Sequence, residues 1–159
     1  MVNRRVRQQI ANIVQRAPWL VYGARRLWRI RQTKFTAGAV GVILNANGEI
    51  LLVEHVFHPV HPWGLPGGWV DHNEKPAETV QRELAEELDL SVQVGPLLLL
   101  DITFGNHIDL AYLCATNDQV GQLSDELLAY RWVTPDNLPR LHRFHYQAVQ
   151  AALAQQVTA

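Results

Sequence analysis

The sequence contains a single cysteine, Cys114, among its 159 residues. A lone thiol cannot form a disulfide within the chain, and its place in the apolar run IDLAYLCAT predicts a small buried side chain rather than a nucleophile. No apolar run approaches the roughly 20 residues that cross a bilayer, and no tripartite secretion signal opens the chain. These absences predict a soluble, cytoplasmic protein, and the length suits one globular domain.

Acidic residues are absent from the first 34 positions, whereas nine of the fourteen lysines and arginines lie there. Apolar residues recur in this stretch at helical spacing until Pro18 interrupts them: Val2, Val6, Ile10, Ile13, Val14 and Ala17. A second helical stretch follows, with Leu20, Ala24, Leu27 and Trp28 on one side. We expect residues 1–34 to form a basic amphipathic N-terminal helical extension and residues 35–159 to form the main domain.

Four roles fit this basic extension. Docking against the acidic body, or against a second subunit in a homodimer, is the leading interpretation because the charges are complementary. Adsorption to an anionic membrane surface comes next, since Trp19 and Trp28 lie among arginines. Nucleic-acid contact lacks a recognition motif, and a cleaved transit peptide is disfavoured because the segment contains no serine.

The remaining chain mixes strand and helix patterns. Residues 36–44 and 50–55 flank the turn sequence NANG, which predicts a β-hairpin. A proline-rich connection, residues 55–70, leads into a short strand, and Pro76 opens a helix that ends near Leu88. Later elements are predicted as strands over 91–104, 108–116 and 130–134 and a closing helix over 142–154. This order predicts a sheet with helices packed on its faces.

The stretch RELAEELDL places Glu83, Glu86 and Glu87 on one side of the predicted helix, away from a core stripe of Ala77, Val80, Leu84 and Leu88. Like charges at these spacings destabilise a helix by about 0.2–0.5 kcal/mol per pair. One interpretation is a solvated face on which Glu78 and Glu86 pair with Arg82. The other is a site for Mg²⁺ or Mn²⁺, which prefer hard oxygen ligands.

The residues around this helix extend the pattern. From Gly68 to Leu90 the sequence resembles the Nudix box, G-x5-E-x7-R-E-U-x-E-E-x-G-U with U apolar, and matches eight of its nine fixed positions. The departure is Asp89, which stands where the box has its last glycine. Asp tolerates the left-handed backbone that commonly follows a helix, so we expect Asp89 to keep the shape, and Asn73 to allow the same conformation before Glu74.

The resemblance implies a fold and a reaction. The expected fold is α/β in the mixed α+β sense, an α/β/α sandwich with a mixed β-sheet between helices. The implied function is metal-dependent hydrolysis of a diphosphate linkage in a nucleoside diphosphate derivative, such as a nucleotide sugar, a nucleoside triphosphate or a related X-linked compound. The implied cofactor is Mg²⁺, with Mn²⁺ as the alternative, and the small-molecule nucleotide is the main partner.

Site residues follow from their positions in the box. The implied metal ligands are Glu83, Glu86, Glu87 and the carbonyl of Gly67, and the implied catalytic group is Glu83 and Glu86 with Arg82 and Glu74 to orient them. Glu83 is one candidate for the general base, and Glu126 or Asp125 could supply the base or a further ligand. A rival function is a non-catalytic Nudix nucleotide-binding module with a basic partner-binding arm. The complete set of glutamates favours the enzyme.

The substrate is less well defined by the sequence. Nudix enzymes that act on ADP-ribose are expected to have a proline after the box, and those that act on dinucleoside polyphosphates a tyrosine. Both residues are missing from this region of the sequence. Substrate-binding candidates are Trp69, Phe104 and His107, with Trp63 a further aromatic; core packing is the competing interpretation for each. His55, His58 and His61 straddle two prolines and have no cysteine beside them, which disfavours zinc. Solvent exposure is expected for His142 and His145 at the start of the last helix.

Overall fold

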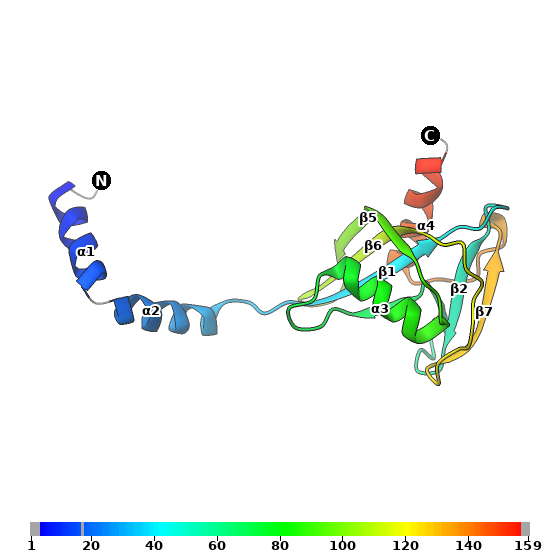
Figure 1. Ribbon diagram of the computed structural model, residues 1–159, viewed down its shortest axis with the longest axis horizontal. Coiled ribbons are helices and arrows are strands. Elements are labelled where there is room, and N and C mark those ends of the chain that lie inside the picture. Colours follow the sequence, from blue (N-terminus) through cyan, green and yellow to red (C-terminus); the bar gives the residue numbers. More distant parts are fainter. Residues whose placement is uncertain (1–3, 17, 157–159) are drawn as a thin grey trace. The chain divides into compact units, whose positions relative to one another are not determined.

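A computed structural model describes residues 4–16 and 18–156 of the chain (Figure 1). The predictions that fall on Val2 and Ala17 therefore lie outside the described residues. The chain divides into two compact units, residues 1–34 and residues 35–159. The chain is thus a short helical unit followed by a larger unit of mixed strands and helices.

The first unit consists of two helices, α1 (Arg4–Arg16) and α2 (Pro18–Arg31). α2 begins at Pro18, where the fixed φ of proline suits a first helical turn. Large apolar side chains of α2 are exposed, among them Trp19, Leu27 and Trp28. Within the described part of the chain, neither these helices nor any other has the length and apolar character needed to cross a membrane.

The described residues of the second unit form two sheets and two helices. The element bounds are β1 Thr36–Ile43, β2 Ile50–His55, β3 Trp63–Gly64, β4 Gly67–Trp69, α3 Pro76–Leu88, β5 Gln93–Ile102, β6 His107–Ala115, β7 Leu127–Val133, a 3-10 turn Pro135–Asn137 and α4 Arg143–Gln156. The mixed four-stranded sheet has the order β4-β1-β6-β5, in which β1 runs parallel to β6 and antiparallel to β4. The antiparallel three-stranded sheet has the order β3-β2-β7.

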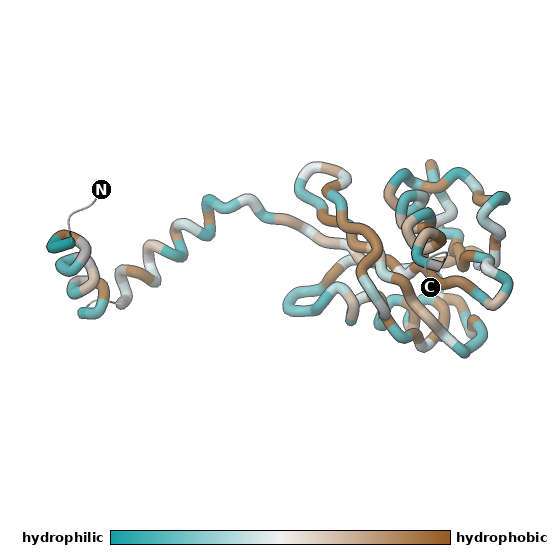
Figure 2. Tube along the Cα trace, turned by 90° about the horizontal axis from the view of Figure 1, so that it is seen from above, coloured by the Kyte–Doolittle hydropathy of each residue, from teal (hydrophilic) through white to brown (hydrophobic). Residues whose placement is uncertain are grey.

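Strands β1 and β2 are buried on both faces, and each face packs against a different helix. Val40 and Val42 of β1 contact the cluster that contains Phe144 of α4, whereas Ala39 and Ile43 join the cluster of α3. β2 alternates in the same way, and Figure 2 shows hydrophobic residues following the strands of this unit. Two-sided burial explains the unbroken apolar runs in both strands. The predicted helix–sheet–helix sandwich is therefore confirmed.

The sequence predicted that β1 and β2 form a hairpin, and this prediction was correct only for the turn between them. The turn itself forms, because Gly48 adopts φ +75° and its N–H donates to the Asn45 carbonyl at 3.0 Å. After a single bridge between Leu44 and Ile50, the two strands enter different sheets. β1 pairs with β4 and β6, and β2 pairs with β3 and β7.

Helix α3 begins and ends where the sequence predicts. Pro76 occupies its first turn, and Asp89 closes it in the left-handed conformation with φ 49° and ψ 44°. The backbone N–H of Asp89 donates to the Ala85 carbonyl at 3.1 Å, and that of Leu90 donates to the Leu84 carbonyl at 3.2 Å. Asn73 also has positive φ, 66°. The expectation that these two residues replace glycine in a left-handed backbone is confirmed.

Candidate active site

Two adjacent glycines bring strand β4 against strand β1 and helix α3. Gly67 has φ +142°, and a Cβ there would collide with the backbone of Ala39 on β1. A Cβ at Gly68 would occupy the position of the Glu83 carboxylate. Glycine at position 67 therefore allows β4 to approach β1, and glycine at position 68 allows β4 to approach α3, with the carboxylate of Glu83 directly over β4.

The three glutamates of the box differ sharply in exposure. Glu87 is only 6% exposed, whereas the side chain of Glu83 is 17% exposed and that of Glu86 is 62% exposed. The Gly67 N–H donates to Glu87 Oε2 at 3.3 Å. The glutamates thus form a row that runs from the interior of the domain to solvent, rather than the single solvated face that spacing alone allowed.

Burial and mutual repulsion disfavour the charged forms of the inner carboxylates. Burial, followed by the charge of Glu83, raises the pKa of Glu87 to about 7. Burial also raises the pKa of Glu83, against the opposing effect of Arg82. Glu126 adds to the negative field on both groups. A positive charge placed among these carboxylates would reverse the penalty.

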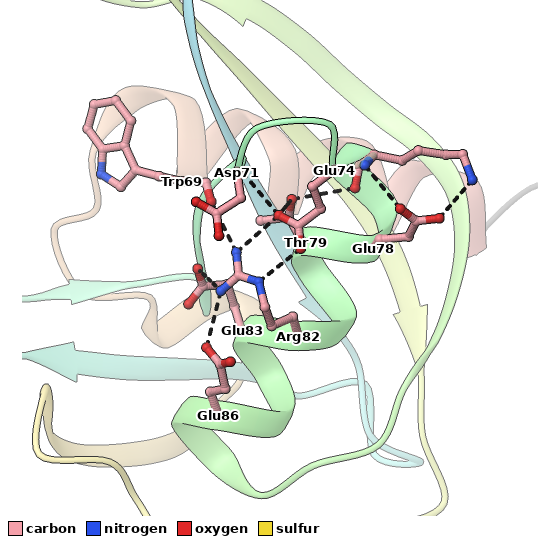
Figure 3. A network of polar contacts seen from close by, with 9 residues as sticks. Trp69, Asp71, Glu74, Glu78, Thr79, Arg82, Glu83 and Glu86 are labelled. Carbon is pink, nitrogen blue, oxygen red and sulfur yellow. Dashed lines mark hydrogen bonds and ion pairs between the residues drawn. The ribbon is translucent and has the colours of Figure 1, made fainter.

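Arg82 holds the two outer glutamates of this row, Glu83 and Glu86, in place (Figure 3). Its Nε and Nη2 donate to the two carboxylate oxygens of Glu74 at 2.9 and 3.1 Å, and Nη1 donates to Glu83 at 2.8 Å and to Glu86 at 3.1 Å. Nη2 also donates to the Trp69 carbonyl at 3.2 Å. A planar guanidinium suits this many fixed acceptors, so Arg82 ties helix α3 to β4 and to the loop between them.

Glu74 is held from several sides. The hydrogen bonds from Arg82, and then that from the Thr79 hydroxyl at 2.7 Å, lower the pKa of Glu74 to about 2. The backbone N–H of Asp71 donates to the same carboxylate at 3.1 Å. Glu74 therefore stays ionised and anchors Arg82, which in turn orients Glu83 and Glu86.

Pairing along the helix differs in part from the solvated-face interpretation. Glu86 does pair with Arg82, as that interpretation expects. Glu78 instead pairs with Lys75 at 2.7 Å, and the Lys75 N–H donates to the same carboxylate at 3.1 Å (Figure 3). Glu78 thus closes the start of α3 and lies apart from the Arg82 network.

A cleft of about 440 Å³ lies beside the row of glutamates. It brings together most of the residues singled out from the sequence: Gly67, Trp69, Arg82, Glu83, Glu87, Phe104, His107 and Glu126. Asp125 is not among the described residues that line it. The cleft is lined both by carboxylates and by aromatic rings, which suits a ligand with a charged and an aromatic part.

The aromatic rings that line the cleft surround His107. The ring of His107 lies 4.5 Å from that of Trp69 and 4.7 Å from that of Phe104, measured between centroids. His107 itself is buried and contacts the Thr36 hydroxyl at 2.7 Å and an Asp109 carboxylate oxygen at 3.2 Å. Trp69 and Phe104 are exposed. The three rings form an aromatic shelf whose two outer rings are exposed.

Three histidines of the cleft were missed as site residues: His55, His58 and His145. The expected solvent exposure of His145 was wrong, because the Leu65 N–H donates to its Nδ1 at 3.0 Å and burial lowers its pKa to about 3. A signal was present in the sequence. His145 shares helical spacing with the buried Leu141, Ala148 and Ala152, and so belongs to the apolar stripe of α4.

The donor set suits a divalent cation of the magnesium type. The acidic side chains that line the cleft are Glu83, Glu87 and Glu126 together with Asp71 and Asp109, and carboxylate oxygens are the ligands that such ions prefer. In the described part of the chain, no three acidic, histidine or cysteine side chains are already arranged around one point. Arg82 occupies Glu83 and Glu86, so the exposed Glu86 has to turn from Arg82 for the three glutamates to share an ion.

Comparison with known proteins identifies this arrangement. The family model described as NUDIX domain matches residues 34–152. The chain belongs to the Nudix family. Among curated relatives, this Nudix chain is 29% identical to a MutT-like protein of Streptomyces ambofaciens over 104 residues, which cover 65% of the chain and 66% of the relative. It is 38% identical to an RNA pyrophosphohydrolase of Cereibacter sphaeroides over 55 residues, 34% of either chain. The matches span just under two thirds of the first relative and about a third of the second.

Solved Nudix structures share the fold. A MutT NUDIX hydrolase from Burkholderia pseudomallei superposes with a TM-score of 0.66 at 26% identity, covering 75% of this chain and 98% of that one. The structure of a UDP-X diphosphatase gives a TM-score of 0.66 at 15% identity and covers 98% of this chain and 86% of that one. These likenesses confirm the mixed α/β sandwich of the Nudix fold.

Proposed function

We propose that this Nudix chain is a metal-dependent hydrolase that cleaves the diphosphate linkage of a nucleoside diphosphate derivative. The observation that carries the proposal is the row of glutamates on α3, which runs from the buried Glu87 to the exposed Glu86 beside a cleft that contains the aromatic shelf. Buried carboxylates cost free energy unless a positive charge accompanies them. Arg82 reaches only the outer part of the row, and Glu87 has no such partner among the described contacts.

The proposed ligands for Mg²⁺ or Mn²⁺ are Glu83, Glu86 and Glu87, with the Gly67 carbonyl and Glu126 as further oxygen donors. When bound, the ion would offset the charge of the diphosphate and lower the pKa of a coordinated water. Glu74 and Arg82 are positioning residues in this scheme. Their fixed hydrogen bonds hold Glu83 at the position where Gly68 leaves room for its carboxylate.

The reaction would then proceed by attack of water on one phosphorus of the linkage. The water oxygen forms a new P–O bond, the bridging P–O bond breaks, and the products are two phosphate monoesters. We assign the proton of the water to Glu83 or Glu126; in support, both line the cleft with Glu87. The aromatic shelf would hold the base of the nucleotide by stacking.

A panel of nucleoside diphosphate sugars, triphosphates and dinucleotides, assayed with Mg²⁺ or Mn²⁺ for released nucleotide or phosphate, tests the proposal. Glu87→Gln removes the charge of the innermost carboxylate and should lower kcat well over tenfold, with the same expected for Glu86→Gln. The matched control is Glu78→Gln, on the same helix but paired with Lys75, and it should retain the kcat of the wild type.

The outcomes separate the enzyme from a binding module. Turnover that survives Glu87→Gln would contradict the assigned role of the glutamates. Tight nucleotide binding without turnover on any compound in the panel would favour the non-catalytic module. Circular dichroism and thermal unfolding of each variant show whether a variant that has lost activity is still folded.

For residues 1–34 we propose contact with an anionic membrane surface. Trp19, Leu27, Trp28 and Ile30 of α2 are exposed between arginines, and the unit contains no acidic residue. The full chain should sediment with vesicles that contain anionic lipid, and a chain of residues 35–159 should not. Equal partitioning of the two chains would reject the membrane role, and a concentration-dependent dimer that requires residues 1–34 would support subunit docking instead.

A further inference from the structure

A second cavity adjoins the cleft. It has a volume of about 370 Å³, and we call it the recess. The recess and the cleft share four wall residues, His58, Phe104, Asp109 and His145. A ligand that extends from the glutamates past these residues would therefore enter the recess without leaving the protein surface.

No lysine or arginine is present among the described residues that line the recess. Its one carboxylate, Asp109, accepts a hydrogen bond from the Thr103 hydroxyl at 2.6 Å and lies 3.2 Å from His107 Nε2. The cation of the neighbouring cleft, Arg82, is engaged by glutamates. Arg131 stacks on the ring of the wall residue Trp63, 3.8 Å from its centroid, but is not among the described residues that line the recess. An additional phosphate group would therefore meet no lysine or arginine in the described lining, so the recess does not suit a polyphosphate.

The recess instead combines apolar surface with imidazole nitrogens. Phe57, Val60 and Trp63 contribute exposed or half-buried apolar walls. His61 Nδ1 is buried and has no hydrogen-bond partner among the described residues. An unpaired buried polar atom costs free energy, and a ligand hydroxyl that reaches this nitrogen from the recess would satisfy it. Aromatic faces beside a free nitrogen suit an uncharged ring that carries hydroxyl groups.

His145 adds a donor at the shared wall. Because the Leu65 N–H donates to Nδ1, the neutral ring must carry its proton on Nε2. The burial that lowers the pKa of His145 to about 3 keeps the ring neutral at physiological pH. The ring therefore offers a hydrogen-bond donor without a positive charge, which again suits a hydroxyl or a neutral oxygen.

We infer that the recess binds the second organic group of the substrate, and that this group is an uncharged, hydroxylated ring such as a sugar. The inference rests on the proposed hydrolase function and narrows its substrate class to nucleoside diphosphate sugars, in preference to nucleoside triphosphates and to RNA with a 5′ polyphosphate end. His61 is then a specificity-determining residue outside the Nudix box.

The first experiment compares kcat/KM for UDP-glucose, ADP-ribose, ATP and a 5′-triphosphorylated oligoribonucleotide with Mg²⁺. At least one diphosphate sugar should exceed both triphosphates by tenfold or more. Preference for a triphosphate would overturn the inference but would leave the proposal of a hydrolase intact.

If none of the four compounds is cleaved, the hydrolase proposal fails, and the recess is then tested by affinity. A diphosphate sugar should still bind more tightly than the free nucleoside diphosphate. Equal affinity for the two compounds would overturn the inference.

The second experiment replaces His61 by phenylalanine. This substitution keeps the ring and removes the unpaired nitrogen, so the fold should be retained. The ratio of kcat/KM for the preferred diphosphate sugar to that for ATP should fall about tenfold or more. The matched control is His72→Phe at an exposed histidine that is absent from the described lining of both cavities, and it should leave the ratio unchanged. Equal ratios in wild type and His61→Phe would contradict the assignment.

Discussion

The two units of this chain use the same residue types in opposite ways. Leu84 of α3 is fully buried against the sheet, whereas Leu27 of α2, on an equally regular helix, is 64% exposed. Arg82 is surrounded by three glutamates, whereas the arginines of residues 1–34 have no acidic residue within their own unit. Helical periodicity therefore predicts that a helix forms, but the chemistry around it decides whether its apolar side chains make a core or a contact surface.

The largest expected effect is the loss of unfolding free energy in Leu84→Ala, which we compare with the same substitution at Leu27. Leu84→Ala removes a fully buried side chain and should lower the free energy of unfolding of the larger unit by about 2–5 kcal/mol. Leu27→Ala removes an exposed one and should change that free energy by less than about 0.5 kcal/mol. Urea denaturation followed by far-UV circular dichroism measures both changes in unfolding free energy. Similar losses for the two variants would contradict the difference between a buried Leu84 and an exposed Leu27.

A smaller effect concerns pH and His145. Its folded pKa, about 3, lies below the ordinary value of 6.5, so the folded state prefers the neutral ring. This contribution to stability is complete above pH 6.5 and is lost as the pH falls from 6.5 toward 3, because only the unfolded ring takes up a proton. The neighbouring His55, His58, His61 and His142 repel the same proton. Residues 1–34 contain no histidine and add nothing to this dependence.

His145→Asn isolates the contribution of that ring. The asparagine oxygen can still accept from the Leu65 N–H but does not titrate. Between pH 7 and 4.5, wild type should lose more than about 1 kcal/mol of unfolding free energy relative to the variant, as measured by urea denaturation. Parallel pH profiles for the two proteins would show that His145 is accessible to protons in the folded state.

Two substitutions that change the conformational freedom of the backbone should have still smaller effects. One introduces a glycine into the larger unit, and the other removes a glycine from residues 1–34. Asp89→Gly places glycine in a left-handed backbone and should raise the unfolding free energy by up to about 1 kcal/mol with turnover intact. Gly23→Ala should raise the helicity of residues 1–34, since Gly23 lies inside α2 and a Cβ there meets nothing within 4 Å. A large loss of turnover in Asp89→Gly would mean that its carboxylate has a role beyond ending the helix.

The outcomes for particular residues show what the sequence could predict. Helix α3 and its left-handed end at Asp89 followed from local patterns, because helix ends are encoded within a few positions. The gathering of Trp69, Phe104 and His107 did not follow, because Trp69 is distant in sequence from the other two and each was only a separate candidate. The separation of β1 from β2 into two sheets did not follow, since it depends on partners about 70 residues away. The burial of His145 could have been predicted from its helical spacing with buried residues, but its hydrogen bond with Leu65 could not, because the two residues are 80 positions apart.

The smallest expected effect is on turnover when residues 1–34 are removed. The family model covers residues 34–152, and the larger unit has its own two-sided core, so residues 35–159 should fold alone and hydrolyse a soluble substrate within about twofold of the full chain. Steady-state assays of the two chains at equal concentration measure this. A large loss of kcat in the shorter chain, with its thermal unfolding unchanged, would mean that the basic helices complete the active site instead of serving as a separate contact surface.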